Sequence, residues 1–98
     1  MRMMMKIVIE NTAGNKAARD NQLGKIMGAL SERLKPEAAY FAPEHGHRTA
    51  FFFFDMKDSS QMPAIAEPLF QELDAHVTFT PVMNADDLQK GLQALASK

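Results

Sequence analysis

Two kinds of hydrophobic pattern divide this chain into strands and helices. Apolar residues alternate with polar ones, or run together in short blocks, over residues 3–10, 38–42, 47–56 and 75–82. Between and after these segments they recur every three or four residues, which is the period of an amphipathic helix. We therefore predict four strands in these ranges and helices over residues 16–34, over the segment that ends near residue 73, and over residues 85–96.

The first predicted helix carries its apolar residues on one side. They are Leu23, Ile26, Met27, Leu30 and Leu34. Residues 11–15 before it are turn-like, and Pro36 ends it, because the residue before a proline disfavours the helical conformation. Gly24 and Gly28 are spaced GxxxG, and we expect them to allow close packing of this helix on the sheet.

The other two helices have recognisable starts. The segment 58–60 offers an N-cap to the second helix, and Pro63 fits its first turn. Pro68 lacks a backbone donor and is expected to bend or split this helix. Asn84 can cap the last helix, whose narrow apolar stripe is formed by Leu88, Leu92 and Leu95.

The order strand, helix, strand, strand, helix, strand is the split βαβ pattern of ferredoxin-like domains. It predicts an α+β fold in which right-handed crossovers give an antiparallel sheet of order 4-1-3-2, with the first and third strands in the centre. Residues 1–98 are expected to form a single domain, with residues 83–98 as an appended C-terminal helix.

Four consecutive phenylalanines, Phe51 to Phe54, occupy the third strand. Since alternate side chains of a strand point to opposite faces, two rings lie on each face of the sheet. We expect the helices to cover Phe52 and Phe54. The face that carries Phe51 and Phe53 then needs another cover, and a second copy of the chain is the simplest one. The sequence thus predicts a homodimer.

Composition narrows the function classes. The formal net charge is −1 and the sequence pI is near 6.3, so that no excess of positive charge is present to bind nucleic acid or an anionic membrane. No apolar run approaches the roughly 20 residues of a membrane span. The chain has no cysteine, which excludes disulfides and thiol nucleophiles. We expect a cytoplasmic protein, and no cofactor is indicated.

The predicted pairing of the strands brings Glu10 near His76 and near the start of the third strand, where His47 lies. A carboxylate beside a histidine is a plausible proton-transfer pair, because it fixes the tautomer and raises the pKa of the imidazole. An ordinary ion pair at the end of a sheet is the competing interpretation. The same pairing places Lys6 towards Asp55 and Thr80, where a simple cross-strand contact is again the alternative.

The hairpin tip has some features of a metal site. Glu44, His45 and His47 lie close together in sequence, and imidazole is a common metal ligand. No third and fourth ligand can be named, so we predict a polar turn around Gly46 and no metal. The segment 14–16 lacks the spacing of a phosphate-binding loop and is interpreted as a turn.

The element order, the segment 67–70 and the following strand 77–82 resemble the dimeric α/β-barrel superfamily. This group includes muconolactone isomerases, antibiotic-biosynthesis monooxygenases that need no cofactor, and YCII-related proteins. The resemblance implies a ferredoxin-like homodimer whose two sheets pack face to face as an α/β barrel. It also implies a small-molecule pocket, either between sheet and helices or at the dimer seam. None of the catalytic motifs of these families maps onto this chain.

Two functional hypotheses follow. In the first, the chain is a small enzyme of the isomerase or monooxygenase type that acts without a cofactor on an apolar or aromatic metabolite. In the second, it is a non-catalytic homodimeric module that binds a ligand or another protein, with the last helix, residues 85–96, packed across the dimer seam. For the first hypothesis, the candidate catalytic residues are His76, His47 and Glu10, and the candidate substrate-binding residues are Tyr40, Phe51, Phe53, Asp55 and Lys6.

Overall fold

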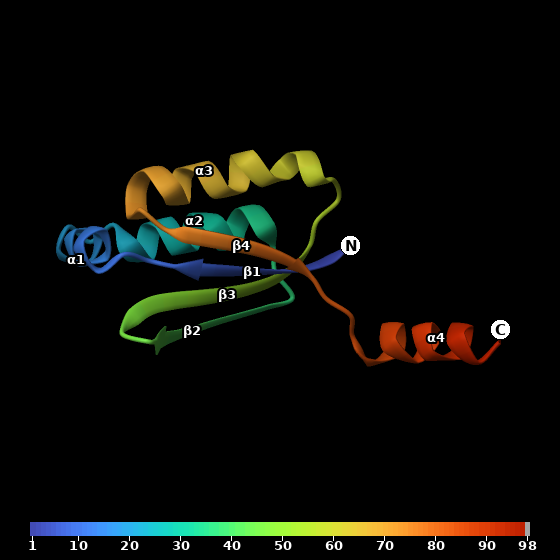
Figure 1. The fold of residues 1–98 in the computed structure, drawn as a ribbon. Helices are drawn as coiled ribbons and strands as arrows, with labels where there is room; N and C mark the ends of the chain where they lie inside the picture. Colours follow the sequence, from blue (N-terminus) through green and yellow to red (C-terminus); the bar gives the residue numbers. More distant parts are fainter. Residues whose placement is uncertain (98) are drawn as a thin grey trace.

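The computed structural model describes residues 1–97, which form an α+β fold with helices packed on one face of a four-stranded antiparallel sheet (Figure 1). The elements are β1 (Arg2–Val8), α1 (Asn11–Arg19), α2 (Leu23–Leu34), β2 (Ala38–Glu44), β3 (His47–Asp55), α3 (Met62–Leu73), β4 (His76–Pro81) and α4 (Ala85–Ala96), with a short 3-10 helix, η1, over Ser59–Gln61.

The sheet has the order β2-β3-β1-β4, which is 4-1-3-2 when it is read from the opposite edge. All neighbouring strands are antiparallel, and β1 and β3 lie in the centre. Met5 faces Phe52 of β3 on one side and Phe79 of β4 on the other. This arrangement is compatible with a ferredoxin-like fold.

The core lies between the sheet and the helices α2 and α3. The fully buried large side chains are Phe52, Met5, Ile7, Leu69 and Leu73. Three of them come from the central strands and two from α3, so burial follows the period of two in the strands and the period of about 3.6 in the helix. The prediction that Phe52 and Phe54 face the helices is confirmed, since both are buried.

The prediction of one helix over residues 16–34, preceded by a turn, was wrong. The chain forms α1 and α2, separated at Asn21, which has a left-handed backbone with φ 57°. Asparagine tolerates this conformation better than most residues. The N–H of Gln22 donates to the carbonyl of Ala17 at 2.8 Å and so closes the end of α1. Helix α1 also includes residues 11–15, because the chain turns into a helix directly after Glu10.

The glycines also differ from expectation. Gly24 and Gly28 are exposed, and a Cβ atom built on either of them meets no heavy atom within 4 Å. The GxxxG spacing therefore does not mark close packing on the sheet. The close approach is at buried Gly14, where a Cβ atom would lie 2.9 Å from Nη1 of Arg48 and 3.0 Å from Cγ2 of Ile9.

Helix α3 is continuous through Pro68, so this proline does not split it. Asp58 and Gln61 form a capping box just before the helix: Asp58 accepts a hydrogen bond from the N–H of Ser60 at 2.8 Å, and the Gln61 side chain accepts one from the N–H of Asp58 at 3.4 Å. Pro63 lies in the first turn, as predicted.

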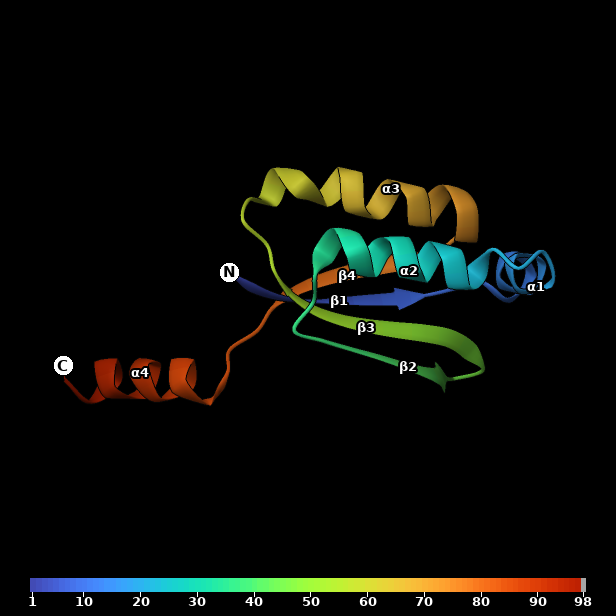
Figure 2. The same cartoon turned by 180° about the vertical axis from the view of Figure 1, so that it is seen from behind.

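Helix α4 projects away from the sheet and from the other helices (Figure 2). None of its residues is buried. The chain therefore measures 56 × 28 × 18 Å, with a radius of gyration of 15.8 Å, whereas a compact domain of this length has a radius of gyration of about 13 Å. The predicted appended helix is thus present, beginning at Ala85, while Lys98 lies outside the described residues.

Candidate functional site

The face of the sheet opposite the helices carries most of the predicted site residues, and we call it the open face. Its centre is apolar and consists of Met4, Tyr40, Phe51 and Phe53, which we call the aromatic patch. The rings of Tyr40 and Phe53 meet edge to face, with centroids 6.4 Å apart. Tyr40 is 64% exposed, and Phe51 and Phe53 are partly exposed. Exposed apolar patches are candidate binding surfaces.

Glu10 and His76 meet at one end of the open face. The strand register places Val8 opposite His76, and Glu10 follows two residues later. The Nε2 atom of His76 lies 2.7 Å from Oε1 of Glu10. The predicted juxtaposition of these two side chains is therefore confirmed. Both are largely exposed to solvent, with side-chain exposures of 69% and 46%, so the pair has no apolar enclosure.

His47 makes a contact of its own at the start of β3. Its Nδ1 atom lies 3.1 Å from the carbonyl oxygen of His45. In the hairpin register it stands opposite Glu44. The hairpin turn gives His45 a left-handed backbone with φ 53°, followed by Gly46 with φ 80°. The turn around Gly46 is therefore as predicted. The pairing of Val8 with Thr49, continued by the hydrogen bond from the N–H of Ile9 to the carbonyl of Arg48 at 3.0 Å, brings the start of β3 to the end of the sheet where Glu10 lies, as expected.

Lys6 does not meet Asp55 or Thr80, which corrects the expected pairing. The register places Lys6 between Phe51 and Thr78, because Asp55 is opposite Arg2, four residues away. The Nζ atom of Lys6 instead lies 2.6 Å from Oε1 of Glu44 and 5.8 Å from the centre of the Phe51 ring. The hydrogen bond from Lys6 lowers the pKa of Glu44 below its ordinary value.

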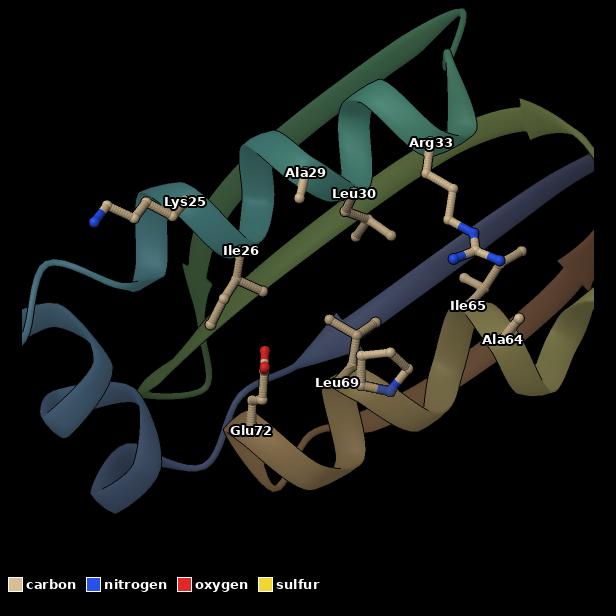
Figure 3. A pocket seen from close by; sticks show the side chains of 10 residues that line it. Lys25, Ile26, Ala29, Leu30, Arg33, Ala64, Ile65, Leu69 and Glu72 are labelled. Carbon is tan, nitrogen blue, oxygen red and sulfur yellow. The ribbon is translucent and has the colours of Figure 1, made fainter.

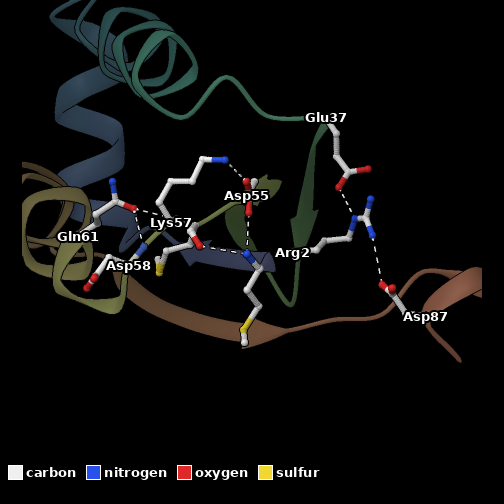
Figure 4. A network of polar contacts seen from close by, with 9 residues as sticks. Arg2, Glu37, Asp55, Lys57, Asp58, Gln61 and Asp87 are labelled. Atoms are coloured by element: carbon white, nitrogen blue, oxygen red, sulfur yellow. Dashed lines mark hydrogen bonds and ion pairs between the residues drawn. The ribbon is translucent and has the colours of Figure 1, made fainter. Parts of the chain in front are cut away.

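Asp55 belongs to a network of ion pairs at the other end of the sheet (Figure 4). It accepts hydrogen bonds from Lys57 and from the amino group of Met1, and these two contacts lower its pKa from the ordinary 3.8 to about 2. Arg2 lies beside it and bridges Glu37 at 2.5 Å and Asp87 at 3.5 Å. The contacts of Asp55 bring chain segments together, as structural ion pairs do.

Residues 1–97 contain no group of three or more His, Cys, Asp or Glu side chains placed to hold a metal ion. At the hairpin tip, the carboxylate of Glu44 is instead bound by Lys6.

A groove between α2 and α3 lies on the opposite side of the molecule from the open face, and sequence reasoning missed it (Figure 3). Its volume is about 440 Å³. Leu30, Ile65 and Leu69 form its apolar floor. Arg33 reaches from α2 towards α3 at one end, and Glu72 reaches back from α3 at the other (Figure 3). The remaining lining residues are Lys25, Ile26, Ala29, Ala64 and Pro68.

The groove exists because small residues line its rim. Ala29 on α2 and both Ala64 and Pro68 on α3 are too short to close the space between the two helices. This is a signal that sequence alone could have given, since these residues occupy helix positions next to core positions. None of the candidate site residues predicted from the sequence lines this groove.

Comparison of the chain with protein-family models, with curated proteins and with solved structures finds no match. The resemblance to dimeric α/β-barrel proteins thus depends on the order and arrangement of elements. Within the described part of the chain, every helix is too short or too polar to cross a membrane.

Proposed function

We propose that this chain is a homodimeric binding module. Its open face pairs with a second copy, and the groove between α2 and α3 takes a small apolar molecule. The observation that supports this proposal is that the two apolar surfaces lie on opposite sides of one sheet. Dimerisation through the open face therefore leaves both grooves accessible.

The case for a second copy begins with the aromatic patch. Its rings lie in a flat sheet surface rather than in a cavity, and a flat apolar surface suits a macromolecular partner better than a small ligand. The resemblance to dimeric α/β-barrel proteins implies that the two sheets pack directly against each other. The proposed dimer is compatible with direct packing of the two sheets. It is also compatible with a dimer in which a further helix or strand lies between them.

The groove suits an apolar body with one anionic end. Small-molecule sites are concave and largely apolar, with a few polar groups that fix orientation, and their volumes lie between about 300 and 1,000 Å³. The groove has an apolar floor, and the guanidinium of Arg33 at one end can bind a carboxylate. An aromatic or medium-chain carboxylate is the class of ligand that we propose.

Oligomeric state tests the first half of the proposal. We expect Phe53→Asp to dissociate the dimer, because it places a charge in the contact. Phe70→Asp is the matched control, since Phe70 is an exposed phenylalanine on α3. Light scattering after size exclusion should show a monomer for the first variant and a dimer for the second. Equal masses for the two variants would contradict the assignment of the interface.

Ligand binding tests the second half. A panel of benzoate, naphthoate and decanoate should include at least one compound that raises the melting temperature of the wild type in a saturable way. Ala64→Phe, which fills the groove, should abolish this shift. Ala18→Phe adds the same ring at an exposed position of α1 and should retain it. If both variants keep the shift, the groove is ruled out as the binding site.

A proton-transfer enzyme is the second candidate, favoured by the contact between Glu10 and His76. The test is exchange of carbon-bound protons for deuterium in a panel of enolisable ketones and lactones, followed by NMR. If the pair is catalytic, Glu10→Gln and His76→Gln should each abolish an exchange that the wild type catalyses. Undiminished exchange in both variants would reject the pair as the catalyst.

A further inference from the structure

We infer that α4 of one copy covers the aromatic patch of the second copy, so that the two chains exchange their C-terminal helices. This inference depends on the proposed dimer and specifies which part of the partner covers the patch. The argument uses the stability of α4, the contacts that set its direction, and the shape of the patch.

Helix α4 is well formed although none of its residues is buried. Asn84 caps it by accepting a hydrogen bond from the N–H of Asp87 at 2.8 Å, while the Asp87 side chain accepts one from the N–H of Asn84 at 3.2 Å. The carboxylates in its first turn also favour the helix dipole. Leu88, Leu92 and Leu95 form one continuous stripe, and they are between 47% and 67% exposed. A capped helix with a solvated leucine stripe is suited to docking.

Contacts at the start of α4 direct it away from its own sheet. The N–H of Val82 donates to the carbonyl of Arg2 at 3.1 Å and thus prolongs the pairing of β4 with β1. Nη1 of Arg2 then lies 3.5 Å from Oδ2 of Asp87. Both contacts hold the helix start at the end of the sheet, and the helix leads outwards from there (Figures 1 and 2). Folding back onto its own open face would break them.

The aromatic patch crosses β2, β3 and β1. The register places Arg2 and Asp55 in the row beyond it at one end, and it places Lys6, which bonds to Glu44, directly opposite Phe51. A second sheet laid on this face would bring these charged groups out of water, which is costly. A helix with a narrow apolar stripe covers less of this face, so that the long side chains of Arg2 and Lys6 can keep their charged ends in water beside it.

The dimensions also agree. The leucine stripe from Leu88 to Leu95 is about 11 Å long at 1.5 Å per residue, and the three strands that carry the patch are about 10 Å across at about 4.8 Å spacing. A two-fold axis makes the exchange mutual, so each leucine stripe and each aromatic patch is covered in a closed dimer. Direct packing of the two sheets would leave both leucine stripes in water.

Cross-linking tests the exchange directly, because the chain has no cysteine of its own. A tagged Phe53→Cys chain is mixed with an untagged Leu92→Cys chain and oxidised. We expect a disulfide-linked heterodimer on a non-reducing gel. Gln93→Cys is the matched control: residue 93 is on the polar side of α4, so it should give at least fivefold less product.

The results of cross-linking and sedimentation together distinguish a failure of the helix exchange from a failure of the proposed dimer. If the wild type is dimeric in sedimentation but Leu92→Cys links no better than Gln93→Cys, the exchange is rejected and the dimer stands. The same holds if Phe53→Cys links efficiently only to itself. If a chain that carries both Phe53→Cys and Leu92→Cys closes its disulfide within itself, α4 folds back and the exchange is also rejected. A monomeric wild type overturns both proposals.

A charge variant provides an independent check that leaves position 53 intact. Leu92→Asp should weaken dimerisation at least tenfold in sedimentation equilibrium, while Gln93→Asp should leave it within about twofold. Equal dissociation constants for the two variants would show that the leucine stripe makes no contact in the dimer.

Discussion

The two faces of β3 carry the same side chain in very different surroundings. Phe52 is 0% exposed and Phe54 is 3% exposed, whereas their neighbours Phe51 and Phe53 are in contact with solvent. The four residues are identical, so the difference arises from what lies over each face. Helices cover one side, and none of the helices in residues 1–97 covers the other (Figure 1). The comparison teaches that an aromatic run specifies a strand, while its burial depends on the layers available to cover it.

The largest effect should come from removing a ring on the covered face. Phe52→Ala should lower the free energy of unfolding by about 3–5 kcal/mol, because it leaves a cavity in a closely packed core. Phe51→Ala should cost clearly less at a protein concentration low enough to dissociate the proposed dimer, since within its own chain that ring is partly exposed and little cavity forms. Urea unfolding at that low concentration measures both. Equal losses there would show that the two rings are equally buried within one chain.

Much of the fold follows from local patterns. The four strands and the face of each phenylalanine could be predicted because alternation in a strand leaves little freedom once one face is buried. The break at Asn21 could not, since the apolar period continues from Ala17 into Leu23 and only the left-handed backbone of one asparagine interrupts it. Single-residue backbone conformations of this kind depend on tertiary packing.

A smaller effect, of opposite sign, is expected on the outer side of α2. Gly28→Ala should raise the free energy of unfolding by roughly 0.5–1 kcal/mol, because alanine is the better helix former and its Cβ meets nothing within 4 Å. Gly14→Ala is the contrasting variant, because there the added methyl group runs into Arg48 and Ile9. Thermal unfolding of both should give a clear gain for the first and a lesser gain or a loss for the second.

Acid titration of stability probes the charged border of the open face. Since the pKa of Asp55 in the folded chain is about 2 against an ordinary 3.8, its ionised form stabilises the fold above about pH 4, and this contribution disappears as the pH falls towards 2. Asp55→Asn should therefore be less stable than the wild type near neutral pH and equal to it near pH 2. A difference that does not change with pH would contradict the ion pairs of Asp55 with Lys57 and the amino group of Met1.

The smallest effect should be the coupling of Glu10 with His76. Both side chains are exposed, so a double-mutant cycle with Glu10→Gln and His76→Gln should give at most about 1 kcal/mol. A larger coupling would mean that a partner encloses this end of the open face in solution.

The candidate site could be predicted only in part from the sequence. The contact of Glu10 with His76 could be predicted because it follows from the order of the strands. The contact of Lys6 with Glu44 was missed, since it depends on the register, and a shift of a few residues changes the neighbour of a long side chain. The groove between α2 and α3 was missed because the apolar stripes were assigned to the core, and the small residues beside them were not considered.

Sedimentation equilibrium of the wild-type chain at micromolar concentration tests the central claim most directly. If a second copy covers the open face, the mass should be twice the 10.9 kDa of one chain. A single species of 10.9 kDa, with the aromatic patch in water, would contradict the claim.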